Sequence, residues 1–131
     1  MTNIELNKFM LKSFPGLENA YLAETSWQEG DVTGSHVVYG DVFCPYIEKM
    51  YIEKNDEELN KIFQFIESIL SIESLYCDEV IAFSVLEKLY DHLEQIEYMR
   101  KFMGDKSLKI CAELSKYISQ ETITSGIGRL L

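Results

Sequence analysis

Apolar residues recur along most of the chain at the three- and four-residue spacings that place them on one face of a helix. The segment 56–70 illustrates the pattern, with apolar residues at Leu59, Ile62, Phe63, Ile66, Ile69 and Leu70. Strand character is confined to "SHVVYG" over 35–40, which is too short to form a sheet alone. The pattern therefore predicts an all-α fold of six to seven helices.

Turn signals and capping residues separate the periodic segments. Pro-Gly at 15–16 interrupts the first of them, and Gly104 is expected to end a later one. Asn3, Asp41 and Asp56 are predicted N-caps, because short polar side chains accept hydrogen bonds from the free N–H groups of a first turn. The expected helices span 3–14, 17–27, 41–53, 56–70, 72–93, 94–103 and 105–118.

The arrangement of these helices is less constrained than their number. The helix over 72–93 is apolar around much of its circumference, which is typical of a central helix covered on several sides. Short connections fit either a compact bundle or a short HEAT-like stack of helical hairpins. With 131 residues we expect a single helical domain over 1–131, in which 119–131 forms a loosely ordered tail because it has little periodicity.

Charge is distributed unevenly. The chain has 12 basic and 22 acidic residues, a net charge of −10, and 19 of the acids but only 6 of the bases lie in 1–97. Such a field repels nucleic acid and anionic lipid and attracts cationic partners, so neither nucleic-acid nor membrane binding is expected. A negative surface also serves solubility alone, so the charge does not by itself define a partner.

Cysteine usage and the N-terminal residues indicate the compartment. Cys44, Cys77 and Cys111 are odd in number, widely spaced and surrounded by apolar residues, so buried core thiols are expected rather than disulfides. The first ten residues lack the basic and apolar pattern of a signal peptide, and no apolar run reaches the roughly 20 residues that span a bilayer. We therefore expect a cytoplasmic protein.

The stretch "GSHVVYGDVFCPY" over 34–46 gathers several rare residue types. His36, Asp41 and Cys44 could belong to a metal-dependent enzyme, but G-x-S-x-G, C-x2-C and H-E-x-x-H motifs are missing from the sequence. We predict no catalytic residue, no metal and no cofactor. Instead we interpret 34–40 as a loop, anchored by hydrogen bonds of His36, that leads into a helix capped by Asp41.

Binding to a protein partner is the function class that remains. Aromatic residues lie among the acids, and an aromatic anchor with a charged rim is typical of interfaces. Tyrosines at the margin of a core show the same pattern, so a structural role stays open for each. The candidate partner-binding residues are Trp27, Asp31, His36, Tyr39, Glu48, Tyr76, Asp78 and Glu79.

Three motifs carry a resemblance to a known group of proteins. They are G-x-H-x-x-x-x-D-V-F-x-P-Y over 34–46, N-D-E-E-L-x-x-I-F-x-F-I-E over 55–67 and E-V-x-x-x-S-V-L-E-x-L over 79–89. With them the chain resembles a family of small acidic bacterial helical proteins of the type that confers immunity to polymorphic toxins. The resemblance implies a non-enzymatic protein that occludes a basic toxin domain. A helical adaptor that acts by self-association is the alternative.

Overall fold

A computed structural model of the chain describes residues 1–26 and 33–116. All regular structure in these residues is helical, with seven helices when contiguous segments are counted together, and no strand occurs among them. The predicted all-α fold is confirmed. Two of the candidate binding residues, Trp27 and Asp31, and the predicted tail over 119–131 lie outside the described residues.

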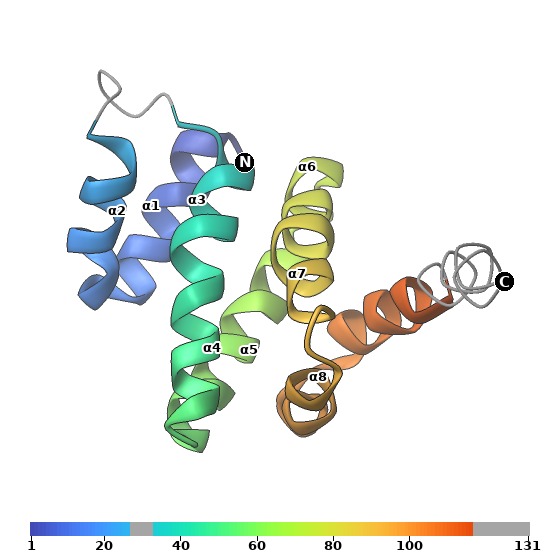
Figure 1. Ribbon diagram of the computed structural model, residues 1–131. Coiled ribbons are helices and arrows are strands. Elements are labelled where there is room, and N and C mark those ends of the chain that lie inside the picture. The colour runs from blue at the N-terminus through green and yellow to red at the C-terminus, as the bar shows by residue number, and fades with distance from the viewer. Residues whose placement is uncertain (27–32, 117–131) are drawn as a thin grey trace, which may run out of the picture.

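Figure 1 shows the path of the chain through these helices. In chain order the segments are α1 (Asn3–Ser13), η1 (Pro15–Leu17), α2 (Glu18–Thr25), α3 (Ser35–Val38), η2 (Tyr39–Phe43), α4 (Cys44–Ile52), α5 (Asp56–Leu70), α6 (Leu75–Glu79), η3 (Val80–Leu86), α7 (Glu87–Leu89), α8 (Leu93–Met99), η4 (Arg100–Phe102) and a last helix over 105–116. Both η1 and η4 are 3-10 turns, whereas η2 and η3 are π-helical. The π-helical segments follow directly on the α-helical ones without a break. The segments α3, η2 and α4 therefore form one continuous helix over 35–52, and α6, η3 and α7 form another over 75–89.

Helix 35–52 corrects the predicted structure of the stretch around His36. The predicted loop over 34–40, its strand-like part included, is wrong, because the helix begins at Ser35. The buried residues Val38, Tyr39, Val42 and Phe43 continue one helix face through the whole segment. Asp41 consequently lies inside the helix and is not its N-cap.

Pro45 also lies within helix 35–52 rather than near its start. A proline in a helix interior lacks an N–H group, and its ring clashes with the carbonyl four residues earlier, here that of Asp41. Asp41 belongs to the π-helical segment η2, where the wider turn differs from the α geometry that produces the clash. The π segment therefore gives the chain a way to carry Pro45 without ending the helix.

The packing is that of a compact bundle. Helix 35–52 contacts α1, α2, α5, η3, α7 and α8, whereas each hairpin of a solenoid contacts only its neighbours in the chain. Helix 75–89 fits the predicted central helix only in part: Val80, Ile81 and Val85 are fully buried, whereas Phe83 is exposed although the sequence predicts cover on several sides. It ends at Leu89 rather than at Leu93, which begins α8.

The core and the helix ends agree with most of the sequence-based expectations. All three cysteines are buried and free, as predicted.

The helix N-caps lie close to the predicted ones. The cap of α1 is Thr2 and the cap of α5 is Asn55, each one residue before the predicted cap, because an equally suitable polar residue precedes it. Gly104 directly follows Met103, the C-cap of η4, so it stands at the predicted C′ position, but without the left-handed φ that usually selects glycine there. None of the described helices is long and apolar enough to cross a membrane.

Candidate functional site

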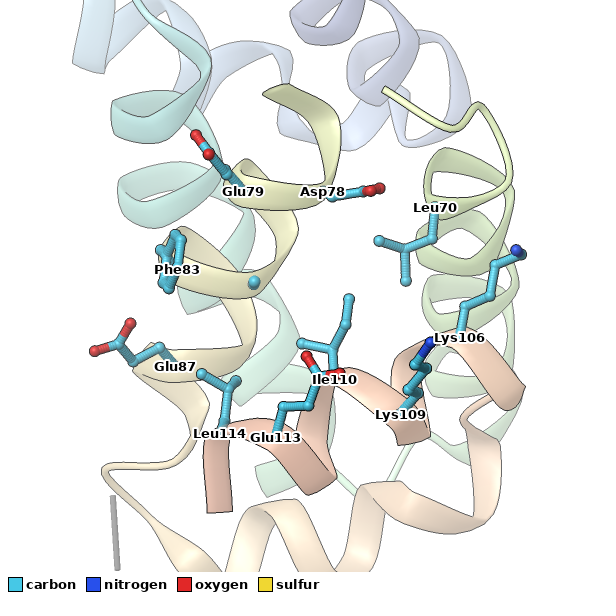
Figure 2. Close-up of a pocket in the computed structure, with 11 residues that line it drawn as sticks. Leu70, Asp78, Glu79, Phe83, Glu87, Lys106, Lys109, Ile110, Glu113 and Leu114 are labelled. Carbon is cyan, nitrogen blue, oxygen red and sulfur yellow. The ribbon is translucent and has the colours of Figure 1, made fainter. Parts of the chain in front are cut away.

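A groove of about 720 Å³ lies between helix 75–89, the end of α5 and the last helix over 105–116 (Figure 2). Its floor is apolar and comes from three elements: Leu70 of α5, Ala82 of η3, and Ile110 and Leu114 of the last helix. Leu70 and Leu114 are themselves buried, so the floor is continuous with the core. The groove is thus a preformed apolar depression at the meeting point of three helices.

One wall of the groove combines an exposed aromatic ring with carboxylates. Glu79, Phe83 and Glu87 lie one above the other along helix 75–89 (Figure 2). Phe83 is 54% exposed, although a central helix covered on several sides is expected to bury it. An exposed phenyl ring contributes little to the stability of the unbound protein, because its apolar surface stays in water. This wall has the composition of an interface core bordered by charge.

The last helix brings charge of both signs to the groove. Lys106 and Lys109 line its side next to α5, and Glu113 lines the other end. With Asp78, Glu79 and Glu87 on helix 75–89, the groove contains more acidic than basic side chains. The negative side chains are concentrated on helix 75–89, and the positive ones face them from the last helix.

Asp78 is the one acidic side chain aimed across the groove. Its carboxylate points from α6 toward Leu70 (Figure 2). The Oδ1 atom is buried and has no hydrogen-bond partner among the described residues. A buried acceptor without a partner destabilises the free protein, and such atoms are rare in folded chains. Asp78 is therefore a position where the fold leaves a hydrogen-bonding capacity unused.

Glu67 of α5 holds the last helix in place beside the groove. Its carboxylate accepts hydrogen bonds from the backbone N–H groups of Lys106 at 2.7 Å and Ser107 at 3.2 Å, and from the Ser107 hydroxyl at 2.9 Å. These N–H groups belong to the first turn of the helix, which favours negative charge. The position of the groove's Lys106 and Lys109 follows from this cap.

The candidate binding residues predicted from sequence lie in different parts of the structure and do not form one site. Asp78 and Glu79 line the groove. His36 and Tyr76 contact each other, with ring centres 5.9 Å apart, and Glu48 is half-buried on α4. Tyr39 contradicts the prediction, because it is fully buried and its hydroxyl donates to the Leu6 carbonyl oxygen at 2.7 Å. It belongs to the core.

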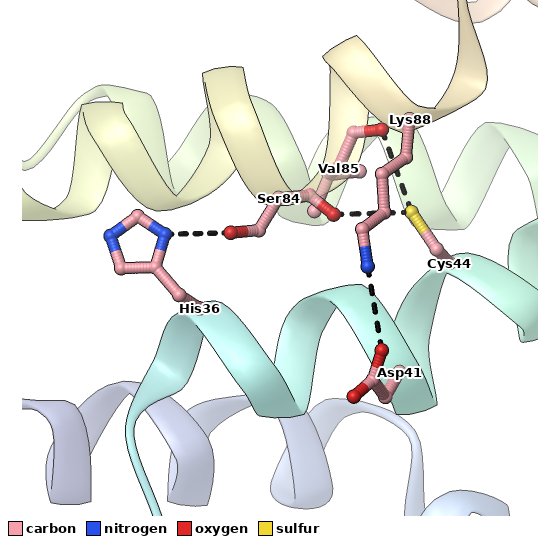
Figure 3. A network of polar contacts seen from close by, with 6 residues as sticks. All are labelled: His36, Asp41, Cys44, Ser84, Val85 and Lys88. Carbon is pink, nitrogen blue, oxygen red and sulfur yellow. Dashed lines mark hydrogen bonds and ion pairs between the residues drawn. The ribbon is translucent and has the colours of Figure 1, made fainter. Parts of the chain in front are cut away.

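The rare residues of 34–46 make separate contacts with helix 75–89 (Figure 3). His36 Nδ1 lies 2.6 Å from Ser84 Oγ, and Asp41 Oδ1 accepts from Lys88 Nζ at 3.4 Å. The Cys44 thiol donates to the Ser84 and Val85 carbonyl oxygens at 3.4 and 3.5 Å. These contacts join helix 35–52 to helix 75–89 at three successive positions, so the rare residues fasten the two long helices together.

That geometry gives no support to chemistry at His36, Asp41 and Cys44. None of the contacts described for the three joins one of them to another, and no group of three His, Cys, Asp or Glu in the described residues is placed to hold a metal ion. Burial raises the pKa of the Cys44 thiol to about 12, whereas a nucleophilic cysteine needs a lowered pKa. His36 anchors its segment by a hydrogen bond, as expected, but from a helix rather than a loop.

Sequence reasoning missed most of the groove. Phe83 belongs to a helix that is apolar on several sides, so no polar face in the sequence indicates which side is exposed. Lys106 and Lys109 belong to a weakly basic segment, and only the packing of the last helix brings them to α6. The signal available in the sequence was the acidic pair Asp78 and Glu79, which does line the groove.

A family described as a domain of unknown function, DUF7674, matches residues 7–119. The match covers most of the chain, which therefore belongs to this family. No curated protein and no solved structure matches it.

Proposed function

We propose that this member of the DUF7674 family is a non-enzymatic binding protein that holds a basic protein partner at the groove. The observation that carries the proposal is the exposure of Phe83 between Glu79 and Glu87, beside an apolar floor. A partner that covers the phenyl ring would remove its apolar surface from water, which is the main driving force of association. The neighbouring carboxylates would form the charged rim.

The charge of the chain supports a basic partner. With a net charge of −10, the protein attracts cationic surfaces from a distance and accelerates their encounter. Glu79, Glu87 and Glu113 then border the place where the partner docks. Because these charges are partly solvent-exposed, the attraction weakens as salt rises.

Immunity to a toxin is the biological form of this function that we propose, with the protein acting in the cytoplasm. It is supported by the motifs over 34–46, 55–67 and 79–89 that resemble such proteins, and by charge. A toxin domain that cuts nucleic acid needs a basic surface to hold phosphates. An acidic protein bound to that surface would block it sterically and electrostatically, with no turnover.

The test places a photo-crosslinking amino acid at position 83 in the cells that produce the protein. Leu22 is the matched control, because it is 53% exposed on α2, which lines no part of the groove. We expect position 83, but not position 22, to capture a protein with a basic surface. The purified pair is then titrated at 50 and 300 mM salt, and co-expression of the protein with a captured toxin should restore growth.

Two outcomes would overturn the proposal. One is that position 83 captures nothing in excess of position 22. The other is that the captured protein binds equally well at both salt concentrations and to a Glu79→Gln, Glu87→Gln variant. Loss of growth rescue alone would reject the immunity role and leave the binding function.

Self-association is a second candidate, favoured by a different surface. Ile52 on α4 and Leu93 on α8 are 72% and 64% exposed, and α4 packs against α8. A second copy that covered both side chains would form an adaptor dimer. Sedimentation at several concentrations should then show a dimer that Ile52→Glu dissociates, whereas a monomer at every concentration rejects this candidate.

A further inference from the structure

We infer that Asp78 recognises one cationic side chain of the partner, an arginine or lysine whose aliphatic stem lies on the groove floor. The inference rests on the proposed function and names the chemistry of the group that enters the groove. It depends on the Asp78 carboxylate, which lines the groove, and on the apolar residues that line the groove with it.

The first argument is the unused hydrogen-bonding capacity of Asp78. Its Oδ1 atom is buried and unpartnered among the described residues, and the carboxylate points into the groove (Figure 2). The ion pairs of the described residues use Asp41, Glu97 and Asp56, and none uses Asp78. Oδ1 itself is closed to solvent, so a ligand meets the Asp78 carboxylate on the side that lines the groove, where a charged N–H donor makes the stronger bond.

The second argument is that the groove around Asp78 is lined by apolar side chains. Leu70, Ala82 and Ile110 line the groove together with Asp78, and Leu70 lies across the groove from the Asp78 carboxylate (Figure 2). Lysine and arginine are the side chains that combine an apolar stem with a terminal cation. An aliphatic stem on these three residues leads a terminal guanidinium or ammonium group to Asp78.

The third argument is the direction of the charge across the groove. Lys106 and Lys109 line the side opposite helix 75–89. They repel a cation from the last helix, whereas Asp78, Glu79 and Glu87 attract it to α6 and its continuation. The groove is therefore polarised, with three of its four carboxylates on helix 75–89 and both of its lysines on the last helix.

The experiment uses the full chain labelled with 15N and two small probes, Nα-acetyl-arginine N-methylamide and its neutral citrulline counterpart. The probes have the same stem and differ in the charge of the head group. We expect the arginine probe to shift the amide signals of Ala82 and Ile110, and the citrulline probe to bind at least about tenfold more weakly. Asp78→Asn should reduce arginine binding by a similar factor.

Two controls keep the result interpretable. Glu113→Gln removes a carboxylate from the opposite end of the groove, and its effect on arginine binding should be much smaller. Asp78→Asn should fold normally, with a midpoint of urea unfolding equal to or above that of the parent protein, because it removes a charge that lacks a hydrogen bond.

Equal binding of the two probes, no binding of either, or arginine binding that survives Asp78→Asn would overturn the inference. These failures are distinct from failure of the proposed function. A protein captured from position 83 and weakened by salt would still establish the binding role if Asp78 made no contribution to it.

Discussion

The carboxylate of Glu67 occupies the space that a side chain at position 104 would need, and Gly104 has no side chain there. A Cβ atom on residue 104 would lie 2.5 Å from Glu67 Cδ and 2.8 Å from its Oε2 atom, closer than real contacts allow. The same carboxylate caps the last helix through the backbone of Lys106 and Ser107. Gly104 thus makes room for the carboxylate that positions one side of the groove.

We predict that Gly104→Ala destabilises the protein by about 1 kcal/mol, the usual cost of a lost helix cap, because Glu67 must move away from the helix end. Urea unfolding measures this change. Gly16→Ala is the matched control, since a Cβ atom there meets nothing within 4 Å. Combining Gly104→Ala with Glu67→Ala should cost less than the sum of the two single changes, because both remove the same cap. Strict additivity would show that glycine and carboxylate act independently.

A pair of acids on α2 and η2 makes stability depend on pH. The hydrogen bond between Glu24 and Asp41 raises the pKa of Glu24 above its ordinary value, and burial and charge repulsion act in the same direction. A raised carboxyl pKa contributes stability below the ordinary value, and this contribution is lost as the pH rises through the raised value. Glu24→Gln should therefore stabilise the protein at pH 7 relative to the parent.

The expected gain from Glu24→Gln is small, because the carboxylate is exposed, and it should vanish at a pH below the ordinary pKa of glutamate. Urea unfolding from pH 3 to 8 tests both statements. Glu18→Gln on the same helix is the control, since Glu18 has no described contact with Asp41. A gain that stays constant across this range would exclude the carboxylate pair as its cause.

Cys44 should resist alkylation in the native protein. Its thiol is buried against the carbonyl groups of Ser84 and Val85, and burial raises its pKa to about 12, so almost no thiolate is present at pH 8. Iodoacetamide labelling followed by mass spectrometry should modify Cys44 only in denaturant. Rapid labelling at pH 8 without denaturant would mean that the thiol is accessible and ionised, and it would reopen the enzyme interpretation.

The sequence predicts a helix well where one face is apolar and a cap precedes it. Segment 56–70 has both features, and α5 occupies it. The pattern fails at 34–46, where Gly40 and Pro45 suggest a break. A Cβ atom at residue 40 would meet Lys88 Nζ at 2.5 Å, although that exposed side-chain end can move away, and the helix carries Pro45 through the π segment that precedes it. The first contact joins residues far apart in the sequence, and α-helical periodicity does not indicate a π segment.

The groove could be predicted only in part for a related reason. A helix that is apolar on several sides gives no indication of which side remains uncovered, and the answer depends on where the last helix docks. Phe83 is consequently exposed although Val80 and Val85 of the same segment are fully buried. Charged residues were more informative, because the acidic pair Asp78 and Glu79 stands out in an otherwise apolar helix and does line the groove.

The corrected position of Asp41 leads to a last prediction, which compares it with a true cap. Asp41 lies inside a helix and forms a half-exposed ion pair with Lys88 at 3.4 Å, so Asp41→Ala should change the free energy of unfolding by less than about 0.5 kcal/mol. Asn55 accepts the N–H of Glu58 at the start of α5, and Asn55→Ala should cost about 1 kcal/mol. Urea unfolding of both variants under the same conditions measures the difference. A larger loss for Asp41→Ala than for Asn55→Ala would restore the capping role and contradict a continuous helix over 35–52.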